Sequence, residues 1–193
     1  MQKTNKIYRN VQEMQTSGRN ISGIAVVVDC WSKDLGGFKE KIDRSALTTE
    51  LIMKSDVMLN IDHDPSKVLA RSKYGKGSLK LQITDRGLEF STEAPNTTLG
   101  NDLLEMIKRG DYSQCSFCFS IPGDAESDYW YNDESGQLCR EIKRFERLYD
   151  VSVVYDPAYD QTAVDARSAN IVNVFAKLAE LDKEIDEIFK YDD

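Results

Sequence analysis

The sequence contains a single histidine, His63, so any imidazole base that this chain supplies must be that side chain. It follows an apolar, strand-like run at Val57–Ile61 and lies between Asp62 and Asp64, directly before Pro65. Catalytic side chains are often held where a strand becomes a loop. Taken alone, however, the pattern favours a surface histidine stabilised by its flanking carboxylates. One imidazole also excludes metal sites that need two or three, such as the zinc-protease helix motif.

A predicted strand at Tyr112–Ile121 carries the hydroxyl groups of interest. Side chains alternate between the two faces of a strand, so one face here is apolar and belongs in the core. The other face carries Gln114, Ser116, Cys118 and Ser120. Ser116 is a candidate nucleophile, because a hydroxyl becomes reactive at neutral pH when a base approaches it. The alternative is an ordinary half-buried strand whose small polar residues face water.

A carboxylate interrupts the apolar strand predicted at Leu148–Tyr155. Asp150 and Ser152 lie on the face opposite the core-directed side chains. A buried carboxylate needs a partner, which makes Asp150 a candidate for pairing with a catalytic base. An exposed edge-strand acid paired with Lys143, Arg144 or Arg147 is the alternative.

The four cysteines are Cys30, Cys115, Cys118 and Cys139. Cys115 and Cys118 have CxxC spacing, but a zinc site would need a second ligand pair, and the other two cysteines lie far apart in the sequence. Buried small side chains are the favoured interpretation, and we expect no metal and no cofactor. Cys118 shares the predicted face of Ser116, so a cysteine hydrolase that uses Cys118 with His63 stays open. Cys115 is disfavoured, because its face is apolar.

Short strands at close spacing make up most of residues 5–162. The predicted strands are Ile21–Asp29, Val57–Ile61, Lys76–Thr84, Gly87–Glu93, Tyr112–Ile121, Tyr129–Tyr131, Gln137–Phe145 and Leu148–Tyr155, with Lys6–Val11 as a further candidate. Two helices are predicted, one over Arg44–Ser55 with Asp43 as its cap, and one from Thr97 or Thr98 to Arg109 with Gly110 as its stop. We therefore expect a mainly β (α+β) fold, a β-barrel of antiparallel strands flanked by a few helices, or a sandwich.

The composition of the chain argues against nucleic-acid binding and against a membrane protein. The 193 residues carry 25 basic and 33 acidic side chains, a net charge of −8. An acidic chain gains nothing from neutralising phosphates, so we expect no nucleic-acid partner. No apolar run approaches the roughly 20 residues that a membrane span needs. The polar segment Met1–Asn20 lacks the apolar core of a signal peptide, so we expect a cytosolic protein.

The C-terminal segment has a different pattern. Apolar residues recur at heptad-like spacing from Asn170 to Lys190, which predicts an amphipathic helix. Residues 180–193 contain seven acids and two lysines, so its outer face is acidic. We therefore divide the chain into a main domain at 1–165 and a helical tail at 166–193. The tail packs on its own main domain or pairs with another chain, so a homo-oligomer is possible.

Motifs along nearly the whole main domain carry a resemblance to one family. They are Gly23–Val28, Gly37–Ile42, Asn60–Asp64 with Val68–Ala70, Gly87–Phe90, Ile107–Asp111, Ser116–Phe119, and Leu148–Val154 with Pro157–Tyr159 and Thr162. In this order they resemble the prohead proteases of tailed bacteriophages, the serine peptidases that mature the capsid. Three positions depart from the family: Cys118 replaces a usual glycine, Cys115 a frequent methionine, and Asp150 a frequent glutamate.

The resemblance implies a fold like that of the herpesvirus capsid-maturation proteases. It makes Ser116 the nucleophile, His63 its base and Asp150 the residue that orients the imidazole, with backbone donors for the oxyanion in the loop 156–162. It implies a serine endopeptidase in the host cytoplasm, inside the assembling procapsid. Its substrates would be the major capsid protein or a separate scaffold, and the chain itself. The rival hypothesis is an assembly protein, with a protease-like barrel joined to a scaffolding helix and catalysis lost or secondary.

Overall fold

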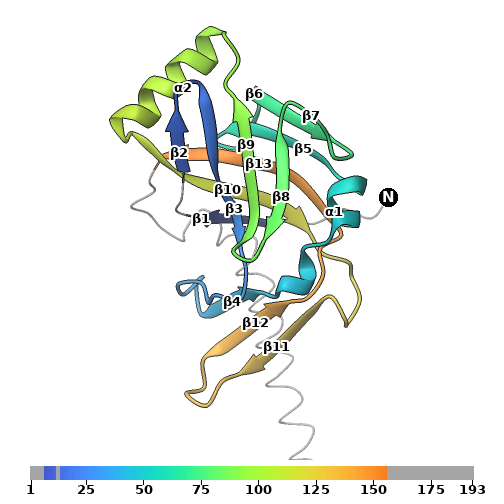
Figure 1. The fold of residues 1–193 in the computed structure, drawn as a ribbon. Coiled ribbons are helices and arrows are strands. Elements are labelled where there is room, and N and C mark those ends of the chain that lie inside the picture. Colours follow the sequence, from blue (N-terminus) through green and yellow to red (C-terminus); the bar gives the residue numbers. More distant parts are fainter. Residues whose placement is uncertain (1–6, 12–13, 156–193) are drawn as a thin grey trace, which may run out of the picture. The chain divides into compact units, whose positions relative to one another are not determined.

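The structure is a computed structural model that describes residues 7–11 and 14–155 (Figure 1). Two predictions, the amphipathic helix at Asn170–Lys190 and the oxyanion loop at 156–162, lie outside the described residues. None of the described helices is long and apolar enough to cross a membrane.

Three sheets make up the described fold. The six-stranded sheet has the order β1 (Ile7–Val11), β10 (Tyr112–Ser120), β13 (Arg147–Tyr155), β5 (Asp56–Ile61), β6 (Asp64–Lys73), β7 (Lys76–Gly77). The four-stranded sheet has the order β2 (Met14–Ser17), β3 (Asn20–Val27), β9 (Gly87–Glu93), β8 (Lys80–Thr84). The three-stranded sheet has the order β11 (Asp128–Asn132), β12 (Leu138–Ile142), β4 (Phe38–Ile42).

The expected closed barrel of antiparallel strands is wrong in two respects. Each described sheet is open, with β1 and β7 at the outer edges of the largest one. Two pairs of strands are parallel, β13 with β5 and β12 with β4. The mainly β character is confirmed. Strand spacing alone does not show which edges pair, because that choice depends on contacts between distant segments.

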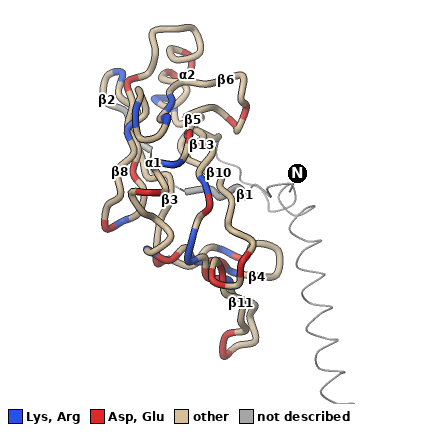
Figure 2. The backbone as a smooth tube through the Cα atoms, turned by 90° about the vertical axis from the view of Figure 1, so that its right-hand side faces the viewer, with Lys and Arg blue, Asp and Glu red and all other residues tan. Residues whose placement is uncertain are grey.

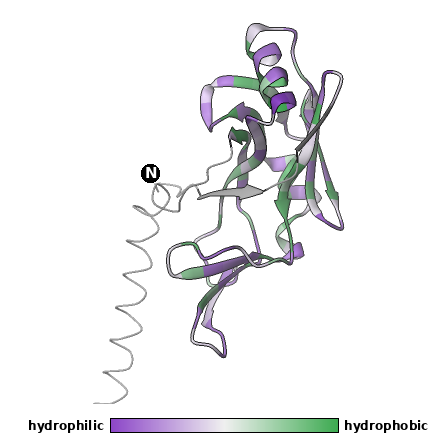
Figure 3. Cartoon of the chain, turned by 90° about the vertical axis from the view of Figure 1, so that its left-hand side faces the viewer, coloured by the Kyte–Doolittle hydropathy of each residue, from purple (hydrophilic) through white to green (hydrophobic). Residues whose placement is uncertain are grey.

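The six-stranded and four-stranded sheets share one apolar core. Phe117 and Val151 of the larger sheet belong to the same buried cluster as Val26 and Phe90 of the smaller one. Figure 3 shows hydrophobic residues gathered along the strands, while helix α2 (Thr98–Arg109) carries both hydrophobic and hydrophilic residues. Both faces of β10 and β13 are largely buried, and the alternation of side chains puts Ser116 and Ser152 on the face opposite Phe117 and Val151.

The helices begin and end at recognisable capping residues. Helix α2 covers Thr98–Arg109, and its N-cap Thr97 accepts a hydrogen bond from the Gly100 amide at 3.2 Å. Gly110 ends it with a φ of +83°, so this predicted helix is confirmed. The other predicted helix is divided in two: Asp43 caps a short 3-10 turn at Arg44–Ala46, and α1 covers Thr49–Lys54.

Acidic and basic residues are interspersed over the described strands (Figure 2). On the three-stranded sheet, Lys143 bridges Asp43 and Glu141 at 2.9 Å each, and Lys41 lies 2.8 Å from Glu141. The two lysines lower the pKa of Glu141 from its usual 4.5 to about 2. Beneath them, Arg140 forms buried ion pairs with Glu40 and Asp128. These pairs hold together a sheet whose segments are distant in the sequence.

Candidate active site

Three neighbouring strands, β10, β13 and β5, form the floor of the candidate site (Figure 1). Ser116 on β10 lies opposite Ser152 on β13, and Asp150 lies opposite Cys118. Directly paired residues share a face of the sheet. Ser116 and Asp150 are therefore on the same face, opposite the apolar core, as the alternation of their strands predicts.

His63 reaches this face from a two-residue turn between β5 and β6. Asp62 and His63 both have positive φ, +53° and +56°, and Ile61 pairs with Asp64 across the turn. Positive φ at both central residues is typical of a type I′ hairpin turn, in which glycine is usual at the second position. A histidine in this conformation costs on the order of 1–3 kcal/mol, and surrounding contacts must hold it there.

The three predicted residues meet in one hydrogen-bonded chain. His63 Nε2 lies 2.6 Å from Ser116 Oγ, and His63 Nδ1 lies 2.6 Å from Asp150 Oδ1. An ionised carboxylate only accepts hydrogen bonds, so Asp150 selects the tautomer with the proton on Nδ1. The Nε2 lone pair then accepts the Ser116 hydroxyl proton. This arrangement makes the hydroxyl a potential nucleophile and the imidazole its base.

The site is largely shielded from solvent. Ser116 is fully buried, while the side chains of His63 and Asp150 are 21% and 11% exposed. Shielding strengthens electrostatic interactions, because little water competes with them. The pairing of Asp150 with Arg144, which the sequence left open, does not occur: Arg144 pairs with Asp124 instead.

The carboxylates on either side of His63 are engaged away from its ring. Asp62 Oδ2 accepts the Tyr112 hydroxyl at 2.8 Å. Asp64 accepts hydrogen bonds from the hydroxyl and the amide of Ser66, and these bonds lower the pKa of the Asp64 carboxyl. Asp150 is thus the carboxylate in position to orient the imidazole.

A family model described as caudovirus prohead serine protease matches residues 6–176. The chain belongs to this family. Among solved structures, it is similar to the capsid assembly protease of bacteriophage T4, with a TM-score of 0.50 and 11% sequence identity. That likeness covers 81% of this chain and 100% of the phage T4 chain, and it supports the fold. No curated protein gave a match.

The cysteines of this prohead protease differ in their suitability for catalysis. Cys115 lies on the core face, and burial raises the pKa of its thiol to about 12, so it stays protonated. Cys118 lies on the site face and is also fully buried. The Nε2 atom of His63 is directed at Ser116 Oγ. In the part of the chain that the structure describes, no cluster of three His, Cys, Asp or Glu residues is able to hold a metal ion.

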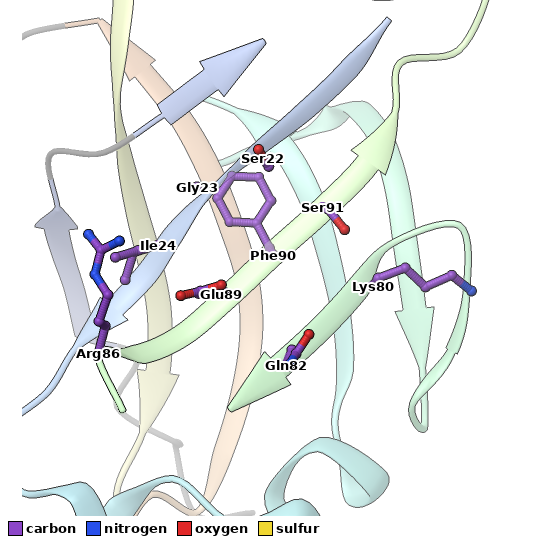
Figure 4. A pocket seen from close by; sticks show the side chains of 9 residues that line it. All are labelled: Ser22, Gly23, Ile24, Lys80, Gln82, Arg86, Glu89, Phe90 and Ser91. Atoms are coloured by element: carbon purple, nitrogen blue, oxygen red, sulfur yellow. The ribbon is translucent and has the colours of Figure 1, made fainter. Parts of the chain in front are cut away.

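A separate groove of about 220 Å³ lies on the four-stranded sheet of the prohead protease (Figure 4). Its lining includes Lys80, Arg86 and Glu89, and none of the three predicted catalytic residues. Figure 4 shows its side chains on β3, β8, β9 and the turn between β8 and β9, while the catalytic candidates lie on the six-stranded sheet and on the turn between β5 and β6. The groove is therefore distinct from the candidate active site.

The sequence did not reveal how the histidine is held. Strand β6 was not predicted, because Pro65 and Lys67 interrupt its pattern. The available signal for a hairpin was a second apolar run at Val68–Ala70, which begins seven residues after Ile61. The contacts of Ser152 and Tyr112 with the turn also went unpredicted, since they join residues far apart in the sequence.

Proposed function

We propose that this prohead protease is a serine endopeptidase with Ser116 as nucleophile, His63 as general base and Asp150 as the residue that orients the imidazole. The observation that supports it most is the continuous chain of two 2.6 Å contacts from Ser116 through His63 to Asp150. The arrangement matches the geometry by which catalytic triads are recognised, whatever their order in the sequence.

The reaction follows from this geometry. Ser116 Oγ attacks the carbonyl carbon of the scissile peptide as His63 Nε2 takes the hydroxyl proton, and Asp150 stabilises the resulting imidazolium. The tetrahedral intermediate collapses, the C–N bond breaks, and the imidazolium gives its proton to the leaving amine. Water then attacks the acyl-enzyme with His63 again as base, releasing the carboxylic acid and restoring Ser116.

The proposed substrates are segments of the major capsid protein or a separate scaffold, and the chain itself. Membership in the prohead protease family supports this assignment. We propose that the reaction takes place in the host cytoplasm, inside the assembling procapsid. We further propose that residues 1–165 form the protease domain and that 166–193 serve assembly. The family match runs to residue 176, eleven residues beyond that boundary.

Two measurements test this proposal: cleavage of the capsid protein, and labelling of Ser116 by a fluorophosphonate probe. Ser116→Ala and His63→Ala each abolish cleavage and probe labelling while the fold persists. The double variant is little worse than either single one, because triad members act as a unit. Full activity of Ser116→Ala rejects the assignment.

The two rival functions give different results in the same assay. A cysteine hydrolase that uses Cys118 loses activity on selective alkylation and leaves Ser116 unlabelled. An assembly protein without catalysis leaves the capsid protein uncut and takes up no probe.

A further inference from the structure

A tyrosine outside the triad contacts the turn that carries His63. The Tyr112 hydroxyl donates a 2.8 Å hydrogen bond to Asp62 Oδ2, across 50 residues of sequence. Tyr112 is the first residue of β10, the strand that also carries Ser116. This hydrogen bond therefore joins the strand of the proposed nucleophile to the residue next to the proposed base.

Two more hydrogen bonds tie the same turn to β13, the strand of Asp150. The His63 amide donates to Ser152 Oγ at 2.8 Å, and the Asp62 amide donates to the Val153 carbonyl at 3.0 Å. Both of these involve the backbone of the turn. The Tyr112 contact fixes a side chain of the turn and links it to a second strand.

The turn needs such anchors because its backbone is unfavourable for a histidine. Asp62 and His63 both have left-handed φ values, and only glycine, asparagine and aspartate adopt that region readily. Contacts that determine the conformation must therefore come from the surrounding strands. A small displacement of the turn moves the imidazole relative to both Ser116 and Asp150.

Tyr112 is suited to a permanent donor role. Burial and the neighbouring Asp62 carboxylate raise the pKa of Tyr112 to about 12, so the hydroxyl keeps its proton at any ordinary pH. Its ring packs edge-on against Tyr155, with the ring centroids 6.2 Å apart. The ring is held in place, and its hydroxyl is always able to donate.

We propose that Tyr112 is a positioning residue that, through Asp62, holds the His63 imidazole between Ser116 and Asp150. The expected effect of Tyr112 on catalysis rests on the proposed function. The hydrogen bond also keeps the Asp62 carboxylate, adjacent to His63 in the chain, from competing with Asp150 as an acceptor for the imidazole.

The test uses the full chain, Tyr112→Phe, and Tyr131→Phe as a matched control. Tyr131 also donates to a carboxylate, Glu141, at 3.1 Å, but it lies on β11 of another sheet. Saturation kinetics of a fluorophosphonate probe separate the maximal rate of labelling Ser116 from probe affinity. We expect Tyr112→Phe to lower the maximal rate about tenfold with affinity nearly unchanged, since small misplacements of catalytic groups cost this much or more. Tyr131→Phe reacts like the unmodified protein.

Two substitutions of Asp62 test the same hydrogen bond from its acceptor side. Asp62→Asn keeps an oxygen acceptor for Tyr112 and tolerates positive φ, so it retains the labelling rate. Asp62→Ala keeps neither property and loses at least as much rate as Tyr112→Phe. Equal losses in Asp62→Asn and Asp62→Ala overturn the positioning role, because they indicate that the charge of Asp62 matters instead.

The single histidine gives a second, independent readout. All imidazole signals in an NMR spectrum belong to His63, so its Nδ1 proton resonance reports the contact with Asp150 directly. We expect Tyr112→Phe to shift or broaden this resonance, and Tyr131→Phe to leave it unchanged. An unchanged resonance together with an unchanged labelling rate overturns the inference. If Ser116 of the unmodified protein takes up no probe, the proposed function fails, and the NMR result alone decides whether Tyr112 positions the imidazole.

Discussion

Replacing Asp150 with asparagine exchanges one carboxylate oxygen at the end of the proposed triad for an NH₂ group and removes the negative charge. The carboxylate oxygen that lies 2.6 Å from His63 Nδ1 now belongs to an amide. When the amide nitrogen faces the ring, it donates to Nδ1 and moves the imidazole proton to Nε2. That tautomer has no lone pair available for the Ser116 hydroxyl proton. When the amide oxygen faces the ring, the imidazolium still lacks a counter-charge.

The expected loss of turnover is large because no other carboxylate replaces Asp150. Asp62 is bonded to Tyr112, and Asp64 to Ser66. In Ser–His–Asp proteases this same change lowers kcat about 10⁴-fold, equivalent to about 5.4 kcal/mol of transition-state stabilisation. We expect a loss of this order here. The fold should persist, since the amide is nearly isosteric with the carboxylate.

The assay measures cleavage of the capsid protein and thermal unfolding of the same samples. Asp124→Asn is the matched control, because it makes the same chemical change at an exposed ion pair with Arg144. It should alter neither turnover nor, appreciably, the melting temperature. Asp150→Glu keeps the carboxylate and should remain active. Near-normal turnover of Asp150→Asn would refute the orienting role.

Three further predictions concern the chain end, a tight turn and an ion pair. A chain shortened after Arg167 should still label with the probe, although it assembles poorly; a folded but inert product would show that the tail completes the site. Gly87→Ala should destabilise the fold by about 3 kcal/mol, since its new Cβ lies 1.9 Å from the Val26 carbonyl oxygen at a φ of +139°. Gly136→Ala, with open space around it, should cost about 1 kcal/mol, and equal melting temperatures of the two variants would contradict this. Glu141 has a pKa lowered from 4.5 to about 2, so its ion pairs stabilise the fold above pH 4.5, and this stability is lost as the pH falls toward 2. The stability difference between the unmodified protein and Glu141→Gln should therefore vanish over that range in acid titrations of the melting temperature.

The faces of the strands could be predicted from the sequence, whereas their neighbours could not. Alternation placed Ser116 and Asp150 on the polar faces of their strands, and the structure has both side chains there. Alternation carries no information on which strand lies alongside, so the parallel pairing of β13 with β5 was missed. The position of His63 over Ser116 depends on a hairpin whose second strand has a weak local pattern.

The central place of β13 has a consequence for the time at which the enzyme becomes competent. His63 and Asp150 are 87 residues apart in the sequence, and β13 lies between β10 and β5 as the last strand of the described chain. A chain emerges from the ribosome N-terminus first, at roughly 5–20 residues per second. A nascent chain that ends before Arg147 lacks both Asp150 and the Ser152 hydroxyl that anchors the histidine turn. The proposed triad is therefore complete only after β13 has left the ribosome and paired with β10 and β5, which are made before it.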